Sequence, residues 1–223
     1  TPSTTDNGWT DQAPGSYSFS EEGIQILYAW VKDAAGNIST AKSSTVNITL
    51  PLLKSASSIY KFEEISGNSV LDSEGNNDGT IQKEENRIKG IEGKGLEFTG
   101  MGCVSLGKCF GDNITNQLTL SAWIKPTSTD NNYQGIIMHG GPNIDSFALY
   151  IKPNDNTIGF KTTGTSNSWT STQVSNMTDG NWHHLVVTYN GSIKTIYFDN
   201  TIVKEITASG NIEFADQNNL LIG

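Results

Sequence analysis

Residues 182–198 read WHHLVVTYNGSIKTIYF, and this stretch decides the class of fold. On both sides of Asn190-Gly191, apolar side chains alternate with polar ones, which is the period of a β-strand. An Asn-Gly pair between two such runs favours a tight hairpin, because both central residues of that turn take positive φ. The stretch therefore predicts two antiparallel strands joined by a hairpin.

Short strand-like runs of the same kind recur along most of the chain. They occupy residues 95–98, 118–126, 135–138, 147–151, 157–160 and 202–203. The composition agrees, since 24 Thr, 23 Ser and 22 Asn among 223 residues favour strands and turns over helices. We predict an all-β protein built from antiparallel sandwiches.

The charge and hydropathy of the chain argue against two kinds of partner. There are 14 Lys and Arg residues against 23 Asp and Glu residues, a formal net charge of −9, so the basic surface that binds nucleic acid is missing. No apolar run approaches the roughly 18 residues of a membrane span. We therefore expect no nucleic acid partner and no membrane insertion.

The N-terminal stretch 1–50 resembles part of a known domain. Strand-like runs at residues 17–19, 24–32 and 45–50 surround a turn at residues 33–37. The run LYAWVKDAAGNIS, residues 27–39, resembles the C-terminal half of the immunoglobulin-like repeats of large prokaryotic surface and secreted proteins. Such a sandwich needs about 80–100 residues, so we expect its first strands to be missing from this chain. The Ser-rich residues 51–57 are the predicted linker.

Residues 58–223 resemble a second family. The resemblance rests on motifs that follow one another along the chain: YKFEE at 60–64, LDSEGNNDGT at 71–80, GKGLEF at 93–98, LTLSAWIKP at 118–126, DGNWHHLV at 179–186 and IYFDN at 196–200. In this order they are similar to the laminin-G-like, concanavalin-A-like jelly rolls of secreted proteins. The resemblance implies an antiparallel jelly-roll sandwich. The family pattern continues with a strand that closes the sandwich, so we expect this domain to lack its closing strand.

The loop at residues 72–79 concentrates oxygen donors between two strand-like segments. Its two glycines let carbonyls and carboxylates converge, which suits calcium with its 6–8 oxygen ligands. The resemblance to laminin-G-like domains also implies calcium at this loop, with Asp72 as a ligand, and we predict Asn77 and Asp78 beside it. The alternative is a solvated turn whose Asp and Asn side chains cap their own backbone.

The two cysteines of the chain, Cys103 and Cys109, flank a short loop. Such a loop can close across a turn in an oxidising compartment, so we predict a local disulfide. The composition favours an extracellular location, secreted or at the cell surface. Two free thiols are the alternative. Metal or redox use would need a closer pair and further soft ligands.

The acidic residues and histidines do not form a catalytic pattern. Glycosidases on related jelly rolls use two facing carboxylates about 5–9 Å apart, whereas the adjacent glutamates at 63–64 and 84–85 point to opposite faces if extended. His183 and His184 share one alternating strand, where one ring faces inward and the other outward, and no nucleophile motif accompanies them. We expect no enzymatic activity.

Two aromatic residues, Tyr133 and Trp169, stand in polar loops. Exposed aromatic rings stack on the apolar faces of sugars while neighbouring polar groups bind the hydroxyls, so we predict a glycan site at these residues. For Trp169 the alternative is a ring that covers an edge of the sandwich. Trp123 and Trp182 lie on alternating apolar strands, where we expect them in the core.

Three functions are compatible with these features. The first is a non-catalytic module of a larger secreted or cell-surface protein, which mediates adhesion or carbohydrate binding and has glycans or neighbouring protein subunits as partners. The second is a structural subunit of a surface layer, sheath or filament, in which incomplete domains exchange strands or self-assemble. The third is a binding accessory to an enzyme on the same polypeptide. We place the first ahead of the other two.

Overall fold

The computed structural model describes residues 1–15, 23–48, 56–75, 77–83, 86–100, 102–108, 114–127, 131–140, 145–214 and 219–223. It divides into two compact units, Thr1–Ala56 and Ser57–Gly223, and the division falls within the predicted linker. The regular structure of these residues is antiparallel strand, as predicted, apart from a 3₁₀ turn, η2, at Pro153–Asp155.

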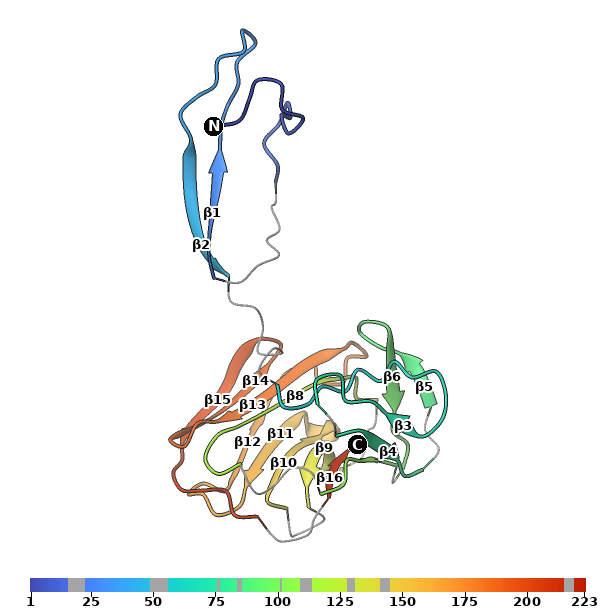
Figure 1. Ribbon diagram of the computed structural model, residues 1–223. Coiled ribbons are helices and arrows are strands. Elements are labelled where there is room, and N and C mark those ends of the chain that lie inside the picture. Colours follow the sequence, from blue (N-terminus) through green and yellow to red (C-terminus); the bar gives the residue numbers. More distant parts are fainter. Residues whose placement is uncertain are drawn as a thin grey trace. The chain divides into compact units, whose positions relative to one another are not determined.

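The N-terminal unit contains a β-hairpin of β1 (Gly23–Ala29) and β2 (Lys42–Ile48), shown in blue in Figure 1. The predicted turn at residues 33–37 is present, and Asp33 holds it, since its carboxylate accepts hydrogen bonds from N (2.8 Å) and Nδ2 (2.9 Å) of Asn37. The strand predicted at residues 17–19 lies outside the described residues. Several large apolar side chains of this unit are exposed, namely Ile24, Ile26, Leu27, Tyr28, Val31 and Val46.

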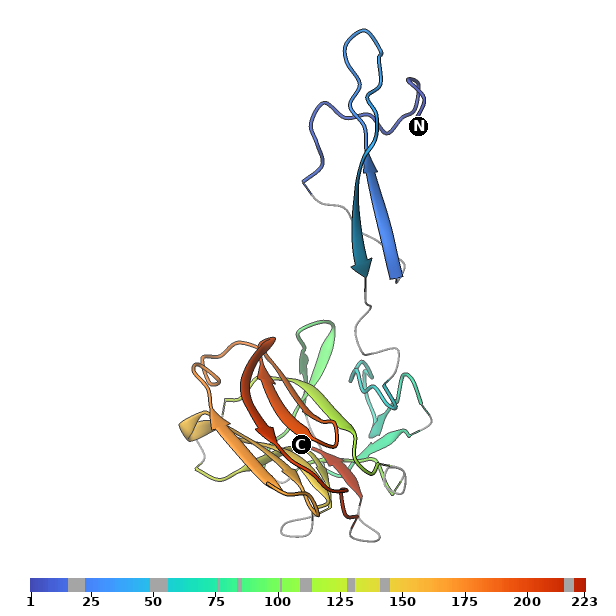
Figure 2. The same ribbon diagram turned by 90° about the vertical axis from the view of Figure 1, so that its left-hand side faces the viewer.

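The C-terminal unit is a sandwich of two stacked sheets, which Figures 1 and 2 show from two sides. The larger sheet has the strand order β12-β11-β10-β9-β16-β7-β4-β3. Its strands are β3 (Ser69–Val70), β4 (Gly79–Ile81), β7 (Val104–Ser105), β9 (Gln134–His139), β10 (Phe147–Lys152), β11 (Thr157–Thr162), β12 (Trp169–Gln173) and β16 (Leu220–Ile222). That this domain lacks a further, closing strand stays a prediction.

The smaller sheet has the strand order β15-β14-β13-β8. Its strands are β8 (Leu118–Ile124), β13 (His183–Tyr189), β14 (Ile193–Phe198) and β15 (Thr201–Thr207). A separate hairpin consists of β5 (Asn86–Lys89) and β6 (Lys94–Glu97). This arrangement is the antiparallel, concanavalin-A-like jelly roll that the sequence motifs imply.

The core lies between the two sheets and follows the predicted alternation. In β13, Leu185, Val187 and Tyr189 are buried, whereas the residues between them are only half-buried. In β10 of the other sheet, Leu149 and Ile151 face the same core. Full burial of each such side chain contributes about 1.5–3 kcal/mol, so the alternating strands account for much of the stability of the sandwich.

The hairpin at Asn190-Gly191 is present, but its geometry differs from the prediction. Only Gly191 takes a positive φ (88°), while the Asn190 Oδ1 atom accepts hydrogen bonds from the amides of Ser192 (3.0 Å) and Ile193 (2.8 Å). The Asn side chain thus takes the place of a backbone acceptor, and the loop between β13 and β14 comprises residues 190–192. The two-residue turn with positive φ at both positions lies between β14 and β15, at residues 199–200.

Candidate functional site

One face of the larger sheet points away from the core and carries an aromatic residue between two glycines. Tyr150 of β10 pairs with Gly159 of β11 on one side and with Gly135 of β9 on the other. Because Leu149 and Ile151 face the core, the alternation of β10 turns Tyr150 outward. The glycines leave room for large side chains to lie across the sheet beside Tyr150.

The side chain of Trp169, at the start of β12, occupies the space over Gly159. A Cβ atom at Gly159 would lie 2.5 Å from Cη2 of the indole, so the ring rests directly against the backbone of β11. Trp169 is nevertheless 40% exposed. Since β12 is an edge strand, the ring does cover an edge of the sandwich, and it also stays open to solvent. Both interpretations of Trp169 from the sequence are therefore compatible with its position.

Tyr133 completes a group of three rings, which we call the aromatic cluster: Tyr133, Tyr150 and Trp169. The ring centroid of Tyr133, which is 46% exposed, lies 5.2 Å from that of Trp169 and 6.3 Å from that of Tyr150. The rings of Tyr150 and Trp169 are 5.8 Å apart. The structure thus brings the two predicted residues together and adds Tyr150, which the sequence analysis missed. Its outward place in the alternating run at residues 147–151 was the signal that could have found it.

A buried carboxylate fixes the aromatic cluster at Tyr150. Asp145 is 3% exposed and accepts hydrogen bonds from Oη of Tyr150 (2.5 Å) and Nζ of Lys161 (3.0 Å). Burial and the neighbouring carboxylate raise the pKa of Tyr150 far above its usual value, so the phenol stays a neutral donor. The ring of Tyr150 therefore has a fixed orientation.

Further charged groups stand at the margin of the aromatic cluster. Lys152 forms an ion pair with Asp155 (2.8 Å), and its ammonium group lies 6.0 Å from the centroid of the Tyr133 ring. The pairs Lys152–Asp155 and Lys161–Asp145 each balance their own charge. Aromatic rings flanked by a few fixed polar groups are typical of sites that orient a polar ligand.

The loop with the predicted calcium ligands is organised by hydrogen bonds to its own backbone. Oδ1 of Asp72 accepts hydrogen bonds from the amides of Ile59 (2.8 Å) and Glu74 (3.2 Å), and Oδ2 accepts one from the amide of Asn77 (3.4 Å). Oδ1 of Asp78 in turn accepts a hydrogen bond from the amide of Asp72 (2.9 Å). These contacts are those of the alternative interpretation, a turn capped by its own side chains.

This donor set does not fit a calcium ion held by Asp72 without rearrangement. The amide groups take lone pairs on both carboxylate oxygens that a cation would need. Within the described ranges, no group of three or more His, Cys, Asp or Glu side chains is placed to hold a metal ion. Calcium binding stays a prediction, and it would require Asp72 to exchange amide donors for the ion.

The predicted disulfide involves a residue outside the described ranges. Cys103 is half-buried, immediately before β7, but Cys109 is not among the described residues. The Cys103–Cys109 bridge therefore stays a prediction, and so does the extracellular location.

His183 and His184 lie on opposite faces of β13, in agreement with the sequence analysis. Nδ1 of His183 lies 2.8 Å from Oδ2 of Asp199, and Nε2 lies 3.1 Å from Oδ1 of Asp179. Both ring nitrogens thus have carboxylate partners, so the ring is not placed as a base for a substrate. Burial favours the neutral imidazole, but the two carboxylates raise the pKa of His183 above its usual value.

We expect the stability of the protein to depend on pH through His183. Because the folded state holds the proton more tightly than the unfolded state, this contribution is complete below the unfolded pKa of about 6.5 and is lost as the pH rises through the raised folded value. The melting temperature of the wild type should fall more steeply over this range than that of H183Q. The control is H184Q, which should retain the steep fall because burial lowers the pKa of His184. Parallel curves for H183Q and wild type would contradict the prediction.

The expectation that Trp123 belongs to the core was wrong. Trp123 is 49% exposed, and its ring stacks on that of His184 with 4.8 Å between centroids, on the outer face of the smaller sheet. The cause is the alternation of β8, in which Leu120 and Ile124 are buried and Trp123 points the other way. Trp182 is half-buried, so it is not a full core residue either.

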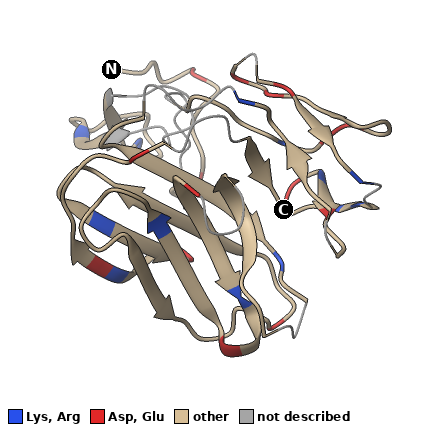
Figure 3. Cartoon of the chain, turned by 90° about the horizontal axis from the view of Figure 1, so that it is seen from below, with Lys and Arg blue, Asp and Glu red and all other residues tan. Residues whose placement is uncertain are grey.

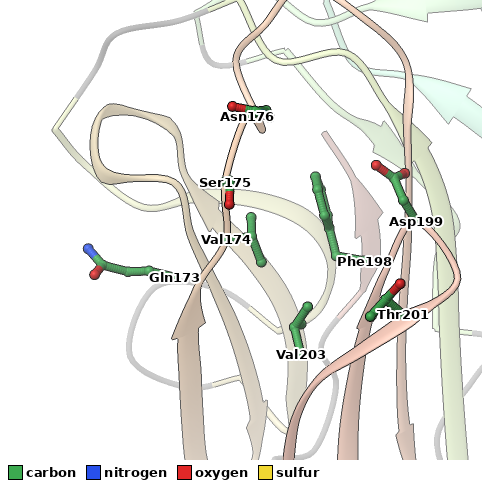
Figure 4. A pocket seen from close by; sticks show the side chains of 8 residues that line it. All are labelled: Gln173, Val174, Ser175, Asn176, Phe198, Asp199, Thr201 and Val203. Atoms are coloured by element: carbon green, nitrogen blue, oxygen red, sulfur yellow. The ribbon is translucent and has the colours of Figure 1, made fainter.

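A cavity of about 530 Å³ lies beside β12 and β15, which are edge strands of the two sheets. Figure 4 shows its lining residues: Gln173, Val174, Ser175, Asn176, Phe198, Asp199, Thr201 and Val203. Two of its polar side chains are engaged, since the Asp199 oxygens accept hydrogen bonds from His183 and the amide of His184, and Gln173 Nε2 donates to the carbonyl of Asp155. The cavity is therefore a weaker candidate for a polar ligand than the aromatic cluster.

Acidic and basic residues are interspersed along the described part of the chain (Figure 3). In Figure 3 the coloured segments are scattered along the chain, and Lys and Arg do not gather into one basic face of the described residues. Nor does the described part of the chain contain a helix of the length and apolar character needed to span a membrane.

Comparison with known proteins places the sandwich in a family. The Laminin_G_3 family model, described as the concanavalin A-like lectin/glucanases superfamily, matches residues 100–223, more than half of the chain. The chain therefore belongs to this family, as the motifs implied for its C-terminal domain. No protein with a curated description matches the chain.

Several solved structures are similar to this chain. Domain 4 of AbnA, a GH43 extracellular arabinanase from Geobacillus stearothermophilus, in complex with arabinotriose, is 18% identical, with a TM-score of 0.52 over 68% of this chain and 76% of that one. A mutant of HCR/D is 15% identical, with a TM-score of 0.51 over 75% of this chain and 43% of that one. At these identities the likeness supports the fold alone.

Proposed function

We propose that the chain is a non-catalytic glycan-binding module and that the aromatic cluster is its binding surface. The observation that carries the proposal is the meeting of two exposed rings, Tyr133 and Trp169, with 5.2 Å between their centroids on one face of the sheet. A sugar can stack its apolar C–H face on such rings while its hydroxyl groups bond to polar side chains at the margin.

The electrostatics of this surface favour a neutral glycan. The lysines beside the aromatic cluster, Lys152 and Lys161, are each paired with a carboxylate, so no free cation is aimed at an anionic sugar from these positions. Domain 4 of AbnA is a structure in complex with arabinotriose, which makes this trisaccharide a sensible first ligand to test.

The test is a glycan array probed with the full 223-residue chain, with and without calcium. We expect signals from neutral oligosaccharides, followed by a measurable dissociation constant for arabinotriose or for the strongest array ligand in a calorimetric titration. Binding confined to acidic glycans, or no binding to any glycan on the array, would contradict the proposal.

The proposal includes the setting of the module. We place it in a larger secreted or cell-surface protein, outside the cell, where glycans are accessible. The support is the predicted disulfide, the resemblance of residues 27–39 to immunoglobulin-like repeats of surface proteins, and a structural neighbour that is itself part of an extracellular arabinanase.

A second candidate function is self-assembly, as in a surface layer or filament. The favouring observation is the N-terminal hairpin, where Ile24 and Val31 are each 72% exposed. Exposed apolar side chains on a small sheet are typical of surfaces that pair with further strands. Sedimentation velocity over a range of concentrations separates this candidate from a monomeric binding module.

A further inference from the structure

Lys194 of β14 is completely buried, which is unusual for a lysine. Its side chain points into the core of the sandwich, where the ammonium group lies 5.4 Å from the ring centroid of Phe160 and 6.0 Å from that of Tyr189. No carboxylate is paired with it among the ion pairs of the described residues. Burial lowers the pKa of Lys194 to about 8.

The partners of Lys194 are two backbone carbonyls that directly precede Trp169 of the aromatic cluster in the chain. Its Nζ atom donates hydrogen bonds to the carbonyl oxygens of Asn167 (2.7 Å) and Ser168 (3.1 Å). The Ser168 carbonyl belongs to the peptide unit that joins Ser168 to Trp169. A side chain of the smaller sheet thus crosses the core and fixes the peptide plane from which the Trp169 side chain projects.

Other contacts hold the same loop from a different direction. The amide of Ser166 donates to the carbonyl of Ser209 (2.8 Å), and Nδ2 of Asn167 donates to the carbonyl of Thr207 (2.9 Å). These bonds attach the loop to the end of β15 and to the segment that follows it. Lys194 holds the carbonyls that turn toward the core, and at Ser168 it does so together with the amide of Thr162, which donates to the same carbonyl (2.8 Å). Asn167 itself has a φ of 53°, a conformation that needs support from its surroundings.

We infer that Lys194 is a positioning residue for glycan binding: by holding the carbonyls of Asn167 and Ser168, it keeps the indole of Trp169 against Gly159 and presented to the sugar. This inference rests on the proposed function of the aromatic cluster. It names a residue that does not touch the glycan and that lies on the opposite sheet.

The same geometry gives the surface a response to pH. The neutral amine of Lys194 still donates hydrogen bonds, but it loses the charge assistance that roughly doubles their strength. The titratable group facing it is Tyr189, whose hydroxyl donates to the carbonyl of Gly210 (2.6 Å) and whose pKa burial raises. Deprotonation of Lys194 around pH 8 should therefore loosen the loop and weaken binding.

As the pH rises, the contribution of Lys194 to the free energy of unfolding should change in the direction opposite to the change in glycan affinity. A lysine whose folded pKa lies below its unfolded value of 10.5 destabilises the folded state at lower pH, and this cost is relieved as the pH rises from about 8 to 10.5. Affinity should thus fall over a range in which the contribution of Lys194 to stability improves. A residue with a purely structural role would move both in the same direction.

The test compares the full wild-type chain with K194M, because methionine fills a similar volume without a donor. With 5-fluorotryptophan incorporated, ¹⁹F NMR reports on the five tryptophans, and W169F assigns the Trp169 signal. We expect the Trp169 signal to shift or broaden in K194M and the affinity for arabinotriose, or for the strongest array ligand, to fall roughly tenfold. The melting temperature should change little, since the lost hydrogen bonds are offset by removal of a buried charge. K204M, on the neighbouring strand β15, is the control and should leave the Trp169 signal in place.

The outcomes separate this inference from the proposed function. An unchanged Trp169 signal in K194M overturns the positioning role, whatever the protein binds. A shifted Trp169 signal in K194M, together with a wild-type chain that binds no glycan, supports the positioning of Trp169 and overturns the proposed function instead. Equal losses of affinity and thermal stability, with all five tryptophan signals disturbed, would show a general structural role and also overturn the inference. Affinity that falls between pH 7 and 9 in the wild type but stays level in K194M supports it.

Discussion

Replacement of Trp169 by alanine should remove most of the glycan binding and leave the sandwich folded. The indole lies on the outer face of the sheet, against Gly159 and beside Tyr133, so its loss removes the main stacking surface and creates no cavity in the core. Central aromatic residues of binding sites typically contribute about 2 kcal/mol, which corresponds to a roughly 30-fold weaker dissociation constant. Calorimetric titration with arabinotriose or the strongest array ligand measures the affinity, and thermal denaturation checks the fold.

The chain offers a matched control on the other sheet. Trp123 is exposed to a similar extent, at 49% against 40% for Trp169, and it also stacks on a neighbouring ring. W123A should therefore leave the affinity unchanged. If W123A loses binding and W169A retains it, the glycan site lies on the smaller sheet and the aromatic cluster is the wrong surface.

A change at Gly159 tests the same surface without removing a ring. A Cβ atom at this position would lie 2.5 Å from the indole, so G159A should displace Trp169 and weaken binding while all three rings remain.

This glycine shows why only part of the site could be predicted from the sequence. Its role depends on the register that places Gly159 beside Tyr150 and Lys161 beside Trp169, and a single sequence does not provide that pairing.

The sequence was most informative where the signal was local. Alternation predicted β13 and β14 and placed the rings of His183 and His184 on opposite faces of one strand. The error at Trp123 has a physical cause: the overall apolar character of its strand was given more weight than the period of two, although Leu120 and Ile124 already assigned Trp123 to the outer face.

Lys194 is a residue whose role could not be predicted from the sequence. The same alternation puts Lys194 on the core face together with Ile196 and Phe198, where a lysine contradicts the hydrophobic pattern. Only the fold shows that two backbone carbonyls from the loop before β12 of the other sheet accept its hydrogen bonds. Contradictions of this kind between pattern and residue often mark positions with a special role.

The second large effect is expected at Asp72, where alanine should destabilise the sandwich in the absence of calcium. The carboxylate accepts hydrogen bonds from the amides of Ile59, Glu74 and Asn77, and each partly buried donor left without an acceptor costs about 1–3 kcal/mol. We expect D72A to lose about 2–3 kcal/mol of unfolding free energy, measured by urea denaturation at neutral pH. Burial opposes the charge of Asp72, yet hydrogen bonds from the Ser58 side chain and from the amides of Ile59 and Glu74 keep its pKa below 3.8, so the stabilisation is present above that pH and is lost as the pH falls through the lowered value.

The effect of calcium on stability distinguishes two roles of Asp72, capping of the loop amides and binding of a metal ion. A tightly bound ion would stabilise the folded chain by about 2.7 kcal/mol at a hundredfold excess over its dissociation constant, and both D72A and D72N would lose this gain. The hydrogen bonds of Asp72 lead us to expect only a small rise in melting temperature with calcium. D72N should then keep most of the wild-type stability, because its remaining oxygen can replace Oδ1, which accepts the two shorter bonds from Ile59 and Glu74. A large calcium-dependent rise that disappears equally in D72A and D72N would instead establish Asp72 as a metal ligand and show that the amide contacts belong to the metal-free loop.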